Sequence, residues 1–139
     1  MRQPLTSTMC GVMAYVSVSE GFPVPLPAEL HYDVADPYAV RLSLGAGEAR
    51  PVNWVFARSL LEEGLSRSTG TGDVLVSPGS RPDFLRIVLR PAAGAALVEM
   101  AVAEVAAFLR RTFLLVPPGE ETLHVDLDRA VAELMIRDE

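Results

Sequence analysis

The chain has 139 residues, half of them hydrophobic, which predicts one folded domain over residues 1–139 and excludes a disordered chain. Its 18 acidic residues outnumber the 12 basic ones, all arginine, and the net charge is -6. This acidic balance argues against nucleic-acid binding, because such binding usually needs a basic surface.

The first half of the chain shows the alternation and turn signals of β-strands. Residues 9–18 are apolar on both faces, which is typical of a strand covered on both sides by its own domain or another subunit. Prolines at positions 23, 25 and 27 keep the next segment extended. Residues 31–44 predict strand, turn and strand around Asp36-Pro37, and a further strand follows over 51–57.

A short helix is expected at residues 58–63, with Gly64 as its C-cap. A glycine-containing loop over 66–72 follows it. Alternating apolar residues then predict three more strands, over residues 73–77, 84–90 and 95–100.

The last third of the chain has helical periodicity. A first stripe ends before Pro117 and consists of Val98, Val102, Val105 and Leu109. A second helix is expected to begin at Asp126 as its N-cap. Its apolar stripe comprises Leu127, Ala130, Val131, Leu134 and Met135. The expected fold class is therefore α+β: antiparallel sheets with a short central helix and C-terminal helices.

Cysteine content and hydropathy indicate a cytoplasmic protein. The single cysteine, Cys10, excludes an intramolecular disulfide and a multi-cysteine zinc site, as expected in a reducing compartment. The most apolar stretch, residues 92–109, contains Glu99 and Glu104, which are costly in a bilayer. We therefore expect membrane contact only indirectly, through a partner.

Two segments contain residues that could bind a ligand. The loop from Ser68 to Asp73 is rich in glycine and threonine, but it leads into a strand and the chain has no lysine, so a tight connection is favoured over a phosphate loop. His124, Asp126 and Asp128 could bind a metal together with His31, but helix capping accounts for both aspartates. No metal or cofactor is expected.

The residues that could act in catalysis or base stacking can also be explained as ordinary core or surface residues. Cys10 could pair with His31 or His124, but it lies in an apolar strand without an activating neighbour. Adjacent carboxylates such as those of Glu62 and Glu63 point in different directions on a helix. Trp54 and Phe56 are interpreted as core residues, with a base-stacking platform as the alternative.

Four motifs resemble those of the SsgA-like proteins. Residues 30–40, LHYDVADPYAV, resemble the family's YD-ADPYAV segment, and residues 54–65, WVFARSLLEEGL, resemble its WVFARDLL-EGL segment. TGTGDV at 69–74 and VPPG at 116–119 match two further motifs. The landmarks follow the family order across residues 26–134, so the chain is identified as a member of this family.

The resemblance implies a non-catalytic adaptor in actinobacterial sporulation. It implies a Whirly-like, bell-shaped homotrimer concentrated at division septa, where it helps to recruit or position the tubulin-like protein FtsZ. A further implied partner is the membrane-associated SsgA. The alternatives are single-stranded nucleic-acid binding through the Whirly-like fold and, least favoured, a small-molecule enzyme.

Polar residues on and after the short central helix are the candidate partner contacts: Arg58, Glu62, Glu63 and Arg67. The alternative is that they only stabilise the following loop through local ion pairs.

Overall fold

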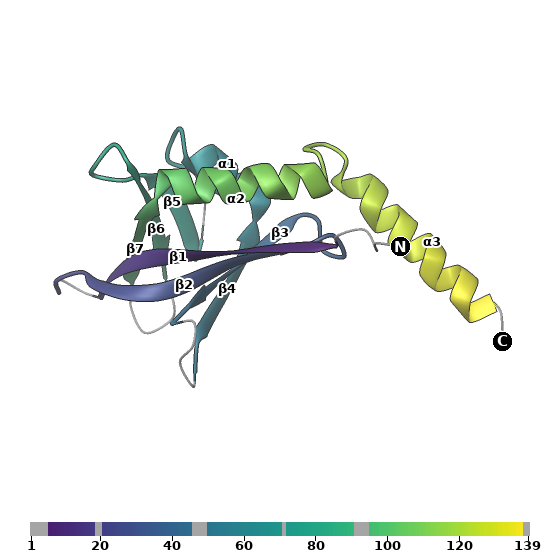
Figure 1. Ribbon diagram of the computed structural model, residues 1–139, viewed down its shortest axis with the longest axis horizontal. Coiled ribbons are helices and arrows are strands. Elements are labelled where there is room, and N and C mark those ends of the chain that lie inside the picture. The colour runs from purple at the N-terminus through teal and green to yellow at the C-terminus, as the bar shows by residue number, and fades with distance from the viewer. Residues whose placement is uncertain (1–5, 19–20, 46–49, 71, 91–94, 138–139) are drawn as a thin grey trace.

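The computed structural model describes residues 6–18, 21–45, 50–70, 72–90 and 95–137 and has an α+β fold (Figure 1). Its strands are β1 Ser7–Val18, β2 Val24–Asp33, β3 Ala39–Leu44, β4 Val52–Ala57, β5 Val74–Pro78, β6 Phe84–Leu89 and β7 Ala96–Ala101. Its helices are α1 Arg58–Gly64, α2 Val102–Leu115 and α3 Glu121–Arg137.

The strands form one antiparallel sheet in the order β4-β3-β2-β1-β7-β6-β5. The long strand β1 joins its two halves, because β1 pairs with β2 along most of its length and with β7 near its end. Helix α1 contacts both β4 and β5, which lie at opposite edges, so the sheet is curled. Both edge strands, β4 and β5, therefore lie close to helix α1.

One face of the curled sheet, here called the inner face, carries the core. On β1 the alternate residues Val12, Ala14 and Val16 are buried, as the period-two pattern requires. Helix α2 lies across this face (Figure 1) and buries Val105 and Phe108 in the same cluster. The strands of both halves and helix α2 thus share one hydrophobic core.

The opposite, outer face is covered by no helix among the described residues, and several apolar side chains are exposed there. The exposed side chains include Met9, Met13 and Tyr15 of β1 and Val55 of β4. The expectation that β1 is covered on both sides is therefore met only on the inner face by this chain.

Strand β2 begins earlier than expected, at Val24, and includes Pro25 and Pro27. The hydrogen bond from Gly45 N to Pro27 O shows that the backbone of Pro27 faces the β3 side. Pro25 lies two residues before Pro27 and faces the same side, so the missing N–H groups of both prolines remove no bond to β1. The regular pairing with β3 begins only at Ala28.

Three expected helix features are wrong. Gly64 is the last residue of α1, while Leu65 is the C-cap; an added Cβ at Gly64 would lie 2.1 Å from Val76 Cγ1. Val98 belongs to β7, and α2 begins only at Val102. Asp126 is not an N-cap, because α3 begins at Glu121.

Candidate functional site

Arg58 lies where β4 passes into α1, and only 2% of its surface is exposed. Its guanidinium donates hydrogen bonds to Thr112 O at 3.2 Å and Val116 O at 2.7 Å, which belong to the C-terminal end of α2. It also forms an ion pair with Glu121 at 2.9 Å. Arg58 therefore links the β4–α1 junction to the end of one helix and the start of the next.

Aromatic rings and a helix end stabilise this buried cation. The guanidinium carbon lies 5.0 Å from the centre of the Tyr32 ring and 4.9 Å from that of Phe113, within the range of cation–π attraction. The carbonyl end of α2 also favours a positive charge. Arg58 is thus an internal structural residue, which corrects its expected place among the surface contacts.

The ionisable neighbours of Arg58 have shifted pKa values. Burial acts to raise the pKa of Glu121, but hydrogen bonds from Arg58 and the backbone outweigh it and lower the pKa below its usual value. Burial raises the pKa of Tyr32, partly offset by the charge of Arg58. The Tyr32 hydroxyl donates to Pro37 O at 2.9 Å, so this group is held as a neutral donor.

The other three candidate contacts, Glu62, Glu63 and Arg67, are exposed beside one another. Arg67 and Glu63 form an ion pair at 3.5 Å, and the hydroxyl of Thr69 donates to Glu63 at 2.9 Å. These bonds fit the alternative in which local pairs hold the loop. Glu62 has no such bond among the described residues and remains available to a partner.

The loop at Ser68–Asp73 folds back onto β5. Thr69 and Val76 exchange two backbone hydrogen bonds, of 2.8 and 2.9 Å. Gly70 and Gly72 adopt φ values of 107° and 84°, which favour glycine. Thr71 lies outside the described residues. The geometry is that of the tight connection favoured from the sequence.

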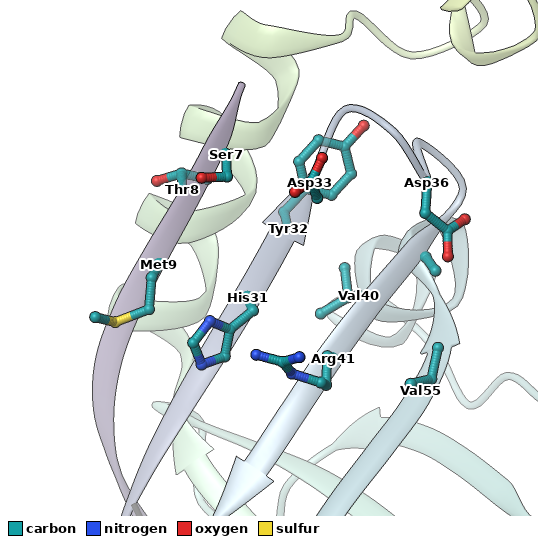
Figure 2. A pocket seen from close by; sticks show the side chains of 11 residues that line it. Ser7, Thr8, Met9, His31, Tyr32, Asp33, Asp36, Val40, Arg41 and Val55 are labelled. Atoms are coloured by element: carbon teal, nitrogen blue, oxygen red, sulfur yellow. The ribbon is translucent and has the colours of Figure 1, made fainter. Parts of the chain in front are cut away.

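A hollow of about 390 Å³ lies on the outer face of the sheet, near the ends of β1 and β2 (Figure 2). A row of side chains crosses four strands there in register: Met9, His31, Arg41 and Val55. His31 Nε2 lies 2.9 Å from Glu29 Oε1, whereas Arg41 is exposed and has no ion pair among the described residues. The row combines apolar contact area with an available positive charge.

The proposed pairs of Cys10 with a histidine are not brought together, and the side chains of Asp126 and Asp128 lie outside those that the structure describes. Cys10 follows the inward alternation of β1 and packs against the core, whereas His31 lies on the outer face. His124 lies on α3 beyond the sheet. In the part of the chain that the structure describes, no three His, Cys, Asp or Glu side chains could hold a metal ion together.

The aromatic residues of β4 support the core interpretation. Phe56 is buried and Trp54 is half-buried against the core, so neither ring forms an open stacking platform. Among the helices described, none is both long and apolar enough to cross a membrane.

Sequence reasoning missed the burial of Arg58 and the row through Arg41. A cation in the first turn of a helix is unfavourable for the helix dipole, and this was a signal that Arg58 has other partners. Strand alternation places Arg41 and Val55 on one face, but it does not show that this face is uncovered.

The chain is similar to known cell-division proteins over most of its length. Residues 26–121 match the family described as "Streptomyces sporulation and cell division protein, SsgA". The sporulation-specific cell division protein SsgB of Thermobifida fusca is 42% identical, covering 92% of this chain and 94% of that protein. SsgB of Streptomyces coelicolor is also 42% identical, covering 94% and 96%.

Two solved structures share this fold. The crystal structure of an SsgA-like sporulation-specific cell division protein from T. fusca has a TM-score of 0.85 at 41% identity, covering 96% of this chain and 98% of that one. A structure concerning SsgB, whose mutations correlate to longitudinal cell division during sporulation of S. coelicolor, has a TM-score of 0.79 at 45% identity, covering 86% and 95%.

Proposed function

Because this chain belongs to the SsgA family of sporulation and cell division proteins, we propose that it is a non-catalytic adaptor that helps to recruit or position FtsZ at division septa. The observation that carries the proposal is the similarity to SsgB of S. coelicolor, named a sporulation-specific cell division protein, over 94% of the chain. A role in cell division follows from these relatives, and FtsZ is the partner we propose for it.

The surface chemistry supports a protein-binding role. The uncovered outer face exposes Met9, Met13 and Val55, and such apolar area is typical of surfaces that bind other proteins. Glu62 and Arg67 add exposed charges near α1, where we place a second set of partner contacts. Arg58 supports that helix from the interior and does not itself touch the partner.

We further propose a homotrimer that acts in the cytoplasm, concentrates at septa and also binds SsgA-type proteins. A fluorescent fusion expressed in sporulating cells tests the location. Analytical ultracentrifugation tests the oligomer, with a single species of three times the chain mass as the expected result.

Light scattering of the purified protein titrated with FtsZ tests the adaptor role. We expect a saturable complex that weakens as the salt concentration rises, because rim charges contribute to association. Absence of a complex over the whole titration would overturn FtsZ recruitment by direct contact. An oligonucleotide titrated under the same conditions is the control for nucleic-acid binding.

A matched pair of variants tests the contacts near α1. Charge reversal by Glu62→Arg is expected to weaken FtsZ binding, whereas Glu104→Arg, an exposed glutamate on α2, is expected to leave it unchanged. Equal affinity of both variants and the wild type would remove Glu62 from the proposed surface.

A further inference from the structure

One edge of the sheet offers unpaired backbone groups. The hydrogen bond from Arg58 N to Tyr38 O continues the ladder between β3 and β4 and fixes its phase. Backbone groups at alternate residues of an antiparallel strand point to opposite edges. The backbone N–H and C=O groups of Val52, Trp54 and Phe56 therefore point toward β3. Those of Asn53, Val55 and Ala57 point away from β3, to the free edge.

The same reasoning shows that the opposite edge is closed. On β5 the outward-facing residues are Val74, Val76 and Pro78, because Val76 exchanges both its backbone bonds with Thr69. Pro78 has no N–H to offer. Folded sheets commonly block an exposed edge with proline or a covering loop, and β5 has both.

Within Val52–Ala57, strand β4 has none of these blocks; Pro51 directly precedes it. Its sequence, VNWVFA, contains no charge and no proline, and no described strand pairs with its outer edge. Val55 is 61% exposed, so the edge is apolar as well as open. An edge of this kind is a template for an extended chain.

The charges near this edge indicate what kind of chain fits. Arg41 lies beside Val55 on the outer face, and Arg50 is exposed two residues before β4 begins. Neither arginine forms an ion pair with any residue that the structure describes. Asp33 and Asp36 line the hollow beside Arg41 without pairing with it, so among the described residues Arg41 and Arg50 remain unpaired cations near the edge and favour a segment that carries carboxylates.

We propose that the outer edge of β4 is a docking site for an extended segment of a partner protein that alternates apolar and acidic residues. The segment adds to the sheet as a further strand and bonds to the outward groups of Asn53, Val55 and Ala57. Carboxylates on the outer face of the added segment approach Arg41, and Arg50 adds positive charge at the start of the strand. As a contact for FtsZ, this site rests on the adaptor role proposed above; as a peptide site, it does not.

A second copy of the chain fits this edge less well. Antiparallel pairing of two β4 strands about Val55 would place both Arg41 side chains on one face, one on each side of the paired strands. A second copy would thus add like charge to this face, whereas a segment with carboxylates adds the opposite charge. The test below distinguishes this occupant from a partner segment.

The test uses a short synthetic peptide that alternates valine with aspartate or glutamate, added to the full-length protein. Backbone amide hydrogen exchange is measured residue by residue. We expect new protection at Asn53, Val55 and Ala57, with little change at Val52, Trp54 and Phe56, whose amides already bond to β3. Lack of new protection, or protection of the outward amides before peptide is added, would overturn the proposal; the second result would indicate self-pairing.

Substitutions at the edge separate backbone pairing from side-chain contact. Val55→Pro removes an outward N–H but leaves the ladder to β3 intact, and we expect it to weaken peptide binding about tenfold, the scale of one lost hydrogen bond. Val55→Thr keeps the N–H and is expected to bind like the wild type. A peptide with lysine in place of the acidic residues should bind less tightly; equal affinity for both peptides, or for both variants, contradicts the proposal.

The same variants titrated with FtsZ decide whether the proposed partner uses this edge. Loss of FtsZ binding in Val55→Pro but not in Val55→Thr supports the edge as the contact. Wild-type binding by both variants would overturn the edge as the FtsZ contact and leave the adaptor role intact. If the wild type itself does not bind FtsZ, the adaptor proposal fails, and the peptide experiment still decides the edge.

Discussion

At the scale of single residues, Arg58 is the most consequential side chain. Its guanidinium bonds in the interior to Thr112 O, Val116 O and Glu121, so its removal takes a donor from Val116 O and the ion-pair partner from Glu121. The sequence shows only an arginine at the start of a helix. Its position in the first helical turn indicates that Arg58 has other partners, but these lie more than fifty positions away, so no local pattern identifies them.

Replacing Arg58 with methionine is expected to destabilise the fold by about 3–5 kcal/mol, the usual cost of breaking a buried ion pair from one side. Chemical denaturation measures this change. Arg67→Met is the control, because Arg67 is 72% exposed in its ion pair with Glu63 and such pairs contribute less than about 1 kcal/mol. Similar effects of the two substitutions would contradict the role given to Arg58.

The lowered pKa of Glu121 predicts a dependence of stability on pH. Its ionised form is favoured by folding, so the stabilisation is present above the usual glutamate pKa of about 4.3 and is lost as the pH falls through the lower folded value. Glu121→Gln should be less stable than the wild type near neutral pH, and the difference should shrink in acid. A difference that stays constant over this range would argue against the ion pair with Arg58.

At the scale of elements, the strands follow local patterns more closely than the helix ends do. Leu85, Ile87 and Leu89 of β6 alternate and are all buried, so their strand could be predicted from sequence alone. Helix α3 begins at Glu121, where bonds from Gly119 and Arg58 stabilise the carboxylate, rather than at Asp126. At position 64 a side chain would collide with Val76 of β5, so glycine is required there by packing and not by helix capping.

The close approach of α1 to β5 gives a direct test of packing. Gly64→Ala places a Cβ 2.1 Å from Val76 Cγ1, and we expect a loss of about 1–3 kcal/mol from overpacking. Gly11→Ala in β1 is the control, because nothing lies within 4 Å of the added carbon. Thermal unfolding of both variants provides the comparison, and an unchanged melting temperature for Gly64→Ala would contradict the close contact.

At the scale of the whole molecule, the two halves of the sheet share β1, one core and helix α1. A core of this kind leaves no division at which one half could unfold alone. The sequence predicted the α+β class because this class follows from the pattern of strands and helices along the chain. The order of the strands and the curl depend on long-range pairing, which composition does not specify.

This continuity predicts a single cooperative unfolding transition. Circular dichroism in the far ultraviolet reports the strands and helices, and fluorescence reports Trp54 on β4, near one edge of the sheet. The two signals should change at the same denaturant concentration, as two-state unfolding requires. Separate midpoints would indicate that the halves of the sheet unfold independently.

The unequal edges of the sheet also limit how copies of the chain can polymerise. Fibres grow when each unit both offers and accepts a strand, which requires two open edges. Here Thr69 and Pro78 close β5, so two copies that met through β4 would form a pair ended by β5 on both sides. In strand addition between copies the molecule is monovalent, and such growth stops at the dimer however concentrated the protein becomes.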